Sequence, residues 1–416
     1  MMMMLLGSSG AMVISSLSVL LLTHYVGPEV YGIYQAVDAL AMIFAVGGLF
    51  AVDKAFFISR SRGEDERIVA IGLVALGCSC IVALGVLWLL IEFGGMLDGG
   101  MSIMMGAYLL FSIFSRGLFS LARSYHIRDT RYRKVYVGEL MRAIGLLVGR
   151  TVAAFTMPNL MGLLLSGLFG SFSGTHRIVR DLYPYIRSGF RKIGDRRFRA
   201  MAFKHRRFLL LEGWGGFMRP LGQRGIIILV APLFGPQQAA IASMAFLLLL
   251  QPLQIAVNAV VDVVRSRLGL AMRGVSMKGD LRYARLMPIW VIGITPLALI
   301  AGITLIELLS PIILGDGWQD IGTASMSMAA LIYGLMIARA LQSVYSQFSR
   351  QDMALLIDST MSIGSLSLIF LFWLLGLPIR QVYFWTGLSL LLFLSGFLIH
   401  FYLWKKADRG SDEISP

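Results

Sequence analysis

The chain has 416 residues, of which 57% are hydrophobic and 14% are charged, and its mean hydropathy is +0.75. A soluble domain carries about 25% charged residues, so this composition excludes an ordinary soluble protein and indicates an integral membrane protein. Lys and Arg number 37 against 23 Asp and Glu, a formal net charge of +14. These basic residues cluster between apolar segments, which is typical of cytoplasmic loops rather than of a surface that binds nucleic acid.

Twelve segments are apolar over the ~20 residues that a helix needs to cross a bilayer. In chain order they are residues 4–26, 33–58, 68–92, 101–123, 136–156, 159–179, 208–232, 238–263, 286–309, 322–348, 353–375 and 381–404. The first lacks a preceding basic region, which favours a full span over a cleaved signal peptide. Cys78 and Cys80 lie inside the third, which favours packing in the membrane over a redox or metal role. The sequence predicts an all-α membrane protein without a metal site.

The loops between these segments alternate in charge. One set, which includes "RSYHIRDTRYRK" and the tail "KKADRGSDEISP", holds 29 of the 37 Lys and Arg residues, whereas the other set holds only Arg380. The positive-inside rule therefore predicts that the first set and both termini are cytoplasmic. The outer loops are short and leave little room for a catalytic domain, so we expect a protein that is not an enzyme.

The longest hydrophilic stretch, residues 180–207, separates the sixth span from the seventh. Phe190, Ile193, Phe198 and Phe203 alternate there with arginines. Two interpretations stay open, an amphipathic segment that lies on anionic headgroups and a solvated basic loop.

The chain also repeats weakly at half its length. A shift of 208 residues aligns "YVGPEVYGIY" (25–34) with "LFGPQQAAIA" (233–242), and both Gly-Pro pairs fall in the turn after the first span of their half. Six spans per half is an even number, so the halves are predicted to be related by a pseudo-two-fold axis along the membrane normal. Such parallel repeats are typical of transporters that work by alternating access.

The expected domains follow from this division. They are an N-terminal six-helix lobe (1–180), a basic cytoplasmic connection (181–207), a C-terminal six-helix lobe (208–404) and a cytoplasmic tail (405–416).

The first 60 residues resemble the polysaccharide-transporter (O-antigen flippase, Wzx-like) branch of the MOP superfamily. These proteins have a Leu-Gly-Pro-Glu-x-Tyr-Gly-x-Tyr turn after the first span, and here the turn is "YVGPEVYGIY", with Val26 in place of Leu. The second span of the family ends in Gly-Leu and a basic residue, and here it ends in "GGLFAVDK".

The resemblance implies a flippase of the bacterial inner membrane. Such a protein moves undecaprenyl-pyrophosphate-linked oligosaccharide, a repeat unit of O-antigen, capsule or exopolysaccharide, from the cytoplasmic to the periplasmic leaflet. It further implies a MOP-type fold with a cationic central cavity, antiport coupled to H+ or Na+, no other cofactor, and polysaccharide assembly proteins as partners beside the lipid bilayer.

Six arginines lie inside predicted spans, where an ionised side chain costs about 2.5–3.5 kcal/mol and normally faces a protein interior or a watery cavity. They are Arg116, Arg142, Arg150, Arg219, Arg224 and Arg339. Lys54 lies near a span end, where its ammonium can reach the interface. Guanidinium groups match phosphate oxygens bidentately and stay charged. We therefore predict that the six arginines bind the diphosphate and acidic sugars of a substrate.

Four carboxylates lie well inside spans and are candidates for ion coupling, because desolvation brings a carboxyl pKa towards neutrality. They are Asp38, Glu139, Glu212 and Asp358. The alternative is that these groups form buried struts, for example Glu139 with Arg142 or Glu212 with Arg219. Four carboxylates cannot neutralise all six arginines, so surplus positive charge is expected.

The stretch "FMRPLGQRGIIILV" (217–230) combines two of these arginines with helix-loosening residues. Arg219 and Arg224 would point about 140° apart on a straight helix. Pro220 removes a backbone donor, and Gly222 follows closely, so we predict a hinge that brings both arginines towards one cavity.

Two other functions remain possible at this stage. One is a related transporter, either a MATE-type drug antiporter or a lipid-linked peptidoglycan precursor flippase, although precursor flippases usually have two further spans. The other is a membrane glycosyl polymerase or ligase, which generally needs catalytic Arg or His in a large outer loop, whereas the outer loops here hold only His24 and Arg380.

Overall fold

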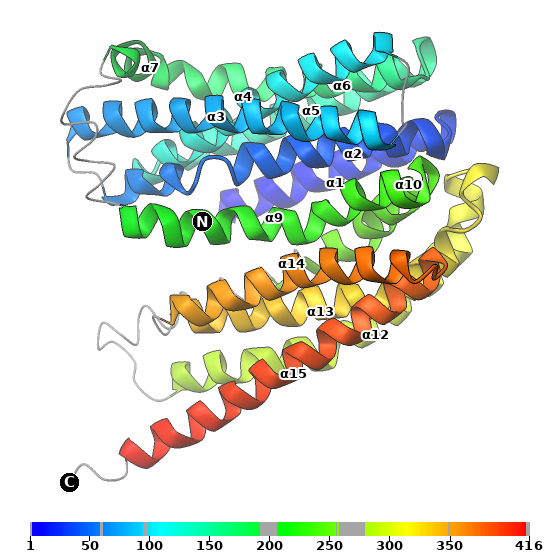
Figure 1. Ribbon diagram of the computed structural model, residues 1–416. Helices are drawn as coiled ribbons and strands as arrows, with labels where there is room; N and C mark the ends of the chain where they lie inside the picture. The colour runs from blue at the N-terminus through cyan, green and yellow to red at the C-terminus, as the bar shows by residue number, and fades with distance from the viewer. Residues whose placement is uncertain are drawn as a thin grey trace. The chain divides into compact units, whose positions relative to one another are not determined.

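The computed structural model describes residues 2–58, 61–94, 99–191, 206–254, 256–257, 279–347 and 350–412, and these contain helices and no strand (Figure 1). The helices up to α7 are α1 (Met2–Tyr25), α2 (Pro28–Val46), η1 (Val52–Ile58), α3 (Arg62–Gly94), α4 (Gly99–Arg128), α5 (Tyr132–Thr156), α6 (Leu160–Val179), η2 (Arg180–Leu182) and α7 (Tyr183–Phe190). The later ones are α9 (Arg206–Phe234), α10 (Pro236–Ala245), η3 (Phe246–Leu250), α12 (Gly279–Ile313), η4 (Asp316–Trp318), α13 (Ile321–Gln347), α14 (Gln351–Leu374) and α15 (Ile379–Asp412).

Eight of the described helices are long and apolar enough to cross a membrane: α2, α3, α4, α9, α12, α13, α14 and α15. The predicted spans 136–156 and 159–179 are helical as α5 and α6, which are not among these eight. The span predicted at 238–263 begins as α10 and η3, and part of it lies outside the described residues. The all-α membrane fold is confirmed, whereas the eight apolar spans do not by themselves reach the predicted twelve.

The prediction of one helix over 33–58 is wrong at both ends. Helix α2 starts at Pro28, at the N1 position that proline favours, and ends at Val46. Phe50 and Ala51 then adopt positive φ angles of 46° and 55°, which no right-handed helix allows, and η1 follows. The end of α2 could not be predicted from hydropathy, because the residues on both sides of it are apolar and hydropathy does not depend on backbone angles.

The two Gly-Pro pairs of the repeat start equivalent helices. Gly27 precedes Pro28 of α2, and Gly235, with φ +96°, precedes Pro236 of α10. The two helices also approach each other directly, since a Cβ added to Gly32 would collide with the backbone carbonyl of Pro236. A side chain larger than hydrogen is therefore excluded at this crossing.

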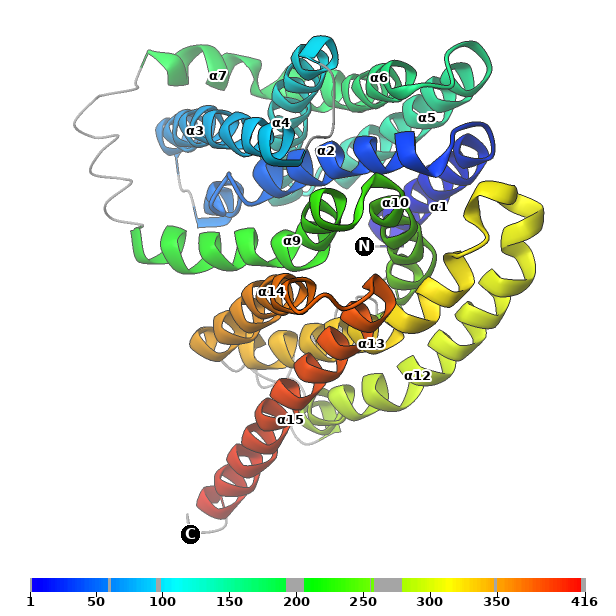
Figure 2. The same ribbon diagram turned by 45° about the vertical axis from the view of Figure 1, so that its right-hand side comes forward.

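The structure divides into two compact units, residues 1–243 with 310–319 and residues 244–309 with 320–416. In the first unit α5 packs along α6 and α1, while α2 packs on α9 and α4 (Figure 2). In the second unit α13 packs on α14 and α15. The first unit includes α9 and part of α10, and the two six-helix lobes with their two-fold axis stay a prediction.

The basic connection is described only in part. Its start forms η2 and the short helix α7, which ends at Phe190. Ile193, Phe198 and Phe203 lie outside the described residues. The tail expected from residue 405 continues α15 as helix to Asp412.

Candidate functional site

The centre of the first unit holds an ion pair between α2 and α4. Asp38 of α2 pairs with the guanidinium group of Arg116, and Tyr108 donates a hydrogen bond of 2.5 Å to the same Asp38 oxygen, Oδ1. The two side chains of the pair are only 16% and 9% exposed. Tyr108 and Arg116 are eight residues apart on α4, so they share one helix face, and that face meets Asp38.

Three further arginines interact electrostatically with Asp38. Arg150, which is 7% exposed, donates from Nη1 to Ser18 Oγ at 2.7 Å and to Ser15 O at 3.2 Å, both on α1. Arg142 also lies on α5, and its guanidinium carbon is 5.4 Å from the ring centroid of Phe119.

Arg224 joins them from α9. Its guanidinium group interacts electrostatically with Asp38, Arg116 and Tyr31. Asp38 also interacts with Arg116, Arg142 and Arg150. We call these five residues, Asp38, Arg116, Arg142, Arg150 and Arg224, the Asp38 cluster. Helix α2 supplies the aspartate, and α4, α5 and α9 supply the four arginines, two of them from α5.

The structure brings together four of the six predicted arginines. Arg219 lies half-buried on α9, and Arg339 lies on α13 in the second unit, so Arg339 is not part of the Asp38 cluster. Helix α9 is assigned continuously through Pro220 and Pro232, and its axis changes direction along its length (Figures 1 and 2). The predicted hinge at Pro220 and Gly222 stays a prediction.

Aromatic rings lie beside the Asp38 cluster, and two of them, Tyr31 and Tyr34, belong to the turn motif "YVGPEVYGIY", which by itself predicted no role for them. Tyr31, Tyr34 and Tyr108 are each no more than 1% exposed, and their ring centroids follow one another at 6.3 and 5.9 Å. Trp318 continues the series, with its ring 5.7 Å from that of Tyr31 and its Nε1 donating to Thr23 O at 3.2 Å. The spacing of Tyr31, Tyr34 and Asp38, three and four residues apart, is a signal that could have found two of the tyrosines.

The guanidinium groups keep unused hydrogen-bonding capacity. In the part of the chain that the structure describes, the Nε atoms of Arg116 and Arg150 and the Ser112 hydroxyl are buried without a hydrogen-bond partner. A buried donor left unsatisfied costs about 1–3 kcal/mol. An anion placed among these groups would remove that cost, so the arrangement can bind an anion.

The predicted coupling carboxylates have defined partners. Glu139 Oε1 accepts from Arg123 Nε at 3.0 Å, and Glu212 Oε2 pairs with Lys54 Nζ at 2.5 Å. Each of these two carboxylates therefore has a cation from another element as a partner, whereas the struts Glu139 with Arg142 and Glu212 with Arg219 stay predictions.

Asp358 is a carboxylate of the second unit. Its side chain is buried on α14 and accepts a hydrogen bond of 2.6 Å from Gln342. Among the described residues, no group of three His, Cys, Asp or Glu side chains could hold a metal ion.

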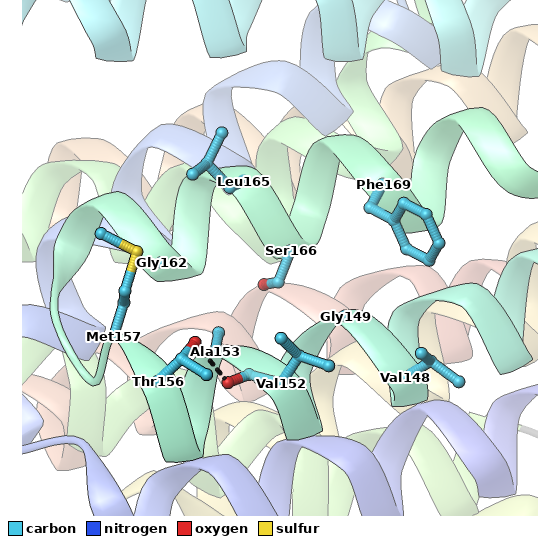
Figure 3. A pocket seen from close by; sticks show the side chains of 10 residues that line it. All are labelled: Val148, Gly149, Val152, Ala153, Thr156, Met157, Gly162, Leu165, Ser166 and Phe169. Atoms are coloured by element: carbon cyan, nitrogen blue, oxygen red, sulfur yellow. Dashed lines mark hydrogen bonds between the residues drawn. The ribbon is translucent and has the colours of Figure 1, made fainter.

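An apolar groove of about 260 Å³ lies between α5 and α6. Its walls are Val148, Gly149, Val152, Ala153, Thr156, Met157, Gly162, Leu165, Ser166 and Phe169 (Figure 3). The Thr156 hydroxyl donates to Val152 O at 2.8 Å and is thereby satisfied within α5. The groove shares α5 with Arg142 and Arg150 but offers no charged group to a ligand.

Comparison with known proteins shows the fold. No protein-family model and no curated protein matches the chain. Among solved structures, the lipid II flippase MurJ in an inward closed conformation has a TM-score of 0.70 at 13% identity, over 97% of this chain and 89% of that one.

Two other transporters are also similar. A Pyrococcus furiosus MOP superfamily transporter with a binding pocket of reversed polarity has a TM-score of 0.57 at 12% identity. The match covers 100% of this chain and 96% of that one. A MATE transporter in a straight conformation has a TM-score of 0.55 at 14% identity. The match covers 97% of this chain and 95% of that one. The chain is a multi-pass membrane protein with the fold of MOP superfamily transporters.

Proposed function

We propose that this protein is a flippase for undecaprenyl-pyrophosphate-linked oligosaccharide and moves it from the cytoplasmic to the periplasmic leaflet by alternating access. The observation that carries the proposal is the Asp38 cluster, where Arg116 pairs with one carboxylate and three further arginines from α5 and α9 interact with it electrostatically. A diphosphate supplies negative charge and several acceptor oxygens, which suits buried guanidinium groups with unsatisfied donors.

Several further elements belong to the same proposal. The protein lies in the bacterial inner membrane with both termini in the cytoplasm, in accordance with the charge of its loops. Coupling to H+ or Na+ involves a carboxylate among Asp38, Glu139, Glu212 and Asp358. Arg219 and Arg339 extend substrate binding, and polysaccharide assembly proteins supply or receive the glycan.

A lipid-linked peptidoglycan precursor is the second candidate substrate, favoured by the likeness to the lipid II flippase. A MATE-type antiporter of organic cations is less favourable, because the surplus of guanidinium groups would repel a cation. The similarity to both a flippase and a MATE transporter means that the fold alone does not select the substrate.

The test is transport in proteoliposomes loaded with a fluorescent undecaprenyl-pyrophosphate oligosaccharide, with movement between leaflets as the readout. Single changes of Arg142, Arg150 or Arg224 to Ala should each lower the rate at least tenfold, and changes to Lys should restore it only in part, because Lys lacks the bidentate fork. Arg380→Ala is the matched control, since Arg380 is 54% exposed and pairs with Asp320. Full transport by all three Ala variants would refute the proposal, and so would wild-type protein that moves no oligosaccharide.

A further inference from the structure

The carboxylate at the centre of the Asp38 cluster occupies the position that an incoming anion would need. We propose that Asp38 is a resident counter-anion, which holds Arg116 while the site is empty and which a phosphate group of the substrate displaces. This inference rests on the proposed function and names the group inside the site with which the substrate must compete.

Geometry supports this role. The contact between Asp38 and Arg116 is a charge-assisted hydrogen bond, and Arg116 also reaches the Asp38 backbone oxygen from Nη1 at 3.4 Å. Tyr108 donates to the same carboxylate oxygen from a side chain that is 0% exposed. Asp38 thus accepts from an arginine and a tyrosine, the same two donor types that commonly bind a phosphate oxygen.

The distribution of charge also supports it. All four arginines of the Asp38 cluster interact electrostatically with Asp38. Arg142 also interacts with Glu139, but that carboxylate forms an ion pair with Arg123 at 3.0 Å. One carboxylate cannot neutralise four guanidinium groups. Positive charge therefore remains to attract an anion, while the strongest single donor is already in use.

Unsatisfied donors show where the anion would bind. Arg116 uses its terminal nitrogens on Asp38, but its Nε is buried without a partner among the described residues, as is the Nε of Arg150. An anion with several oxygens could accept from both Nε atoms and from the terminal nitrogens that Asp38 would release. A diphosphate has more acceptor oxygens and more negative charge than one carboxylate, so it can compete with Asp38 for these donors.

Such a counter-anion has a consequence for transport. A carrier must bind its cargo firmly enough to capture it and weakly enough to release it. Competition from Asp38 weakens binding, and repulsion between Asp38 and the bound diphosphate favours release. Asp38 is therefore a residue that sets affinity, in addition to being a candidate for ion coupling.

The test measures the dissociation constant of inorganic pyrophosphate for purified full-length protein in detergent. Asp38→Asn keeps the shape of the side chain and removes its charge, and it should lower the dissociation constant at least tenfold, which corresponds to about 1.4 kcal/mol. Asp38→Ser is a second neutral variant and should do the same. Asp320→Asn removes a carboxylate that is 56% exposed in the second unit and should leave the constant unchanged.

A double variant identifies the cause. In protein that already carries Arg116→Gln, the gain from Asp38→Asn should fall at least threefold, because the donor that Asp38 would release is missing. Equal or weaker binding of pyrophosphate by both folded Asp38 variants overturns the counter-anion, and so does a gain that is undiminished by Arg116→Gln.

These outcomes are separable from the proposed function. If wild-type protein moves lipid-linked oligosaccharide but Asp38→Asn binds pyrophosphate no more tightly, only the counter-anion is refuted. If Asp38→Asn binds more tightly in a protein that moves no oligosaccharide, the counter-anion stands and the substrate assignment is refuted.

Discussion

Replacement of Asp38 by Asn should destabilise the protein by about 3–5 kcal/mol, the usual cost of removing one partner from a buried ion pair. The physical reason is that Arg116, only 9% exposed, would keep its charge in a site where water cannot solvate it. Arg116→Met alone should cost a similar amount, because it leaves Asp38 charged and buried at 16% exposure.

The double change, Asp38→Asn with Arg116→Met, should be much less destabilising than the sum of the single changes. Replacing both members of a buried pair by groups of similar volume removes the desolvation cost together with the attraction. The expected coupling energy is therefore at least about 3 kcal/mol, the upper end of the range for residues in direct contact.

The assay is the apparent Tm of each variant in detergent, followed by intrinsic fluorescence at a fixed heating rate. Asp320→Asn provides the control, because its partner Arg380 is 54% exposed and an exposed pair contributes only about 0–1 kcal/mol. A shift for Asp38→Asn no larger than that of Asp320→Asn would refute the reasoning, since it would mean that the pair is effectively solvated.

Two further predictions concern packing and charge away from the Asp38 cluster. Gly32→Val should lower the apparent Tm by an amount that corresponds to at least about 1–3 kcal/mol, because the new side chain would displace α10 at Pro236; an unchanged Tm would show that this crossing is loose. At the start of η2, a hydrogen bond from Lys134 lowers the pKa of Asp181 below its ordinary value, so the stabilisation is present near neutral pH and is lost as pH falls through the folded-state pKa. The Tm difference between wild type and Asp181→Asn should therefore shrink below about pH 4, and a difference that does not change with pH would contradict this assignment.

Much of the site was accessible from residue types and positions. Arginines inside apolar spans are costly, so their number and lack of lysine already predicted an anionic ligand. Which of them meet was not accessible, because helix periodicity gives the face of a residue but not the helix opposite that face. Arg224 meets Asp38 across a separation of 186 residues only because α9 packs on α2.

Partner choice among charged groups was equally hidden. Glu139 and Arg142 are neighbours on one helix, and the structure also pairs Glu139 with Arg123 of α4. Glu212 likewise bonds Lys54, 158 residues away. Local spacing shows contacts within a helix, whereas packing also supplies cations from other elements.

The sequence by itself determined that this is an all-helical membrane protein, because hydropathy over ~20 residues follows directly from the bilayer's thickness and its lack of hydrogen-bonding partners. It also predicted an anionic ligand for the arginines inside the spans. Only the tertiary structure decided that α2 stops at Val46, that Arg116 pairs with Asp38, and that three buried tyrosines lie beside this pair. These features depend on backbone angles and on contacts between distant helices, which arise when the chain packs and have no counterpart in local composition.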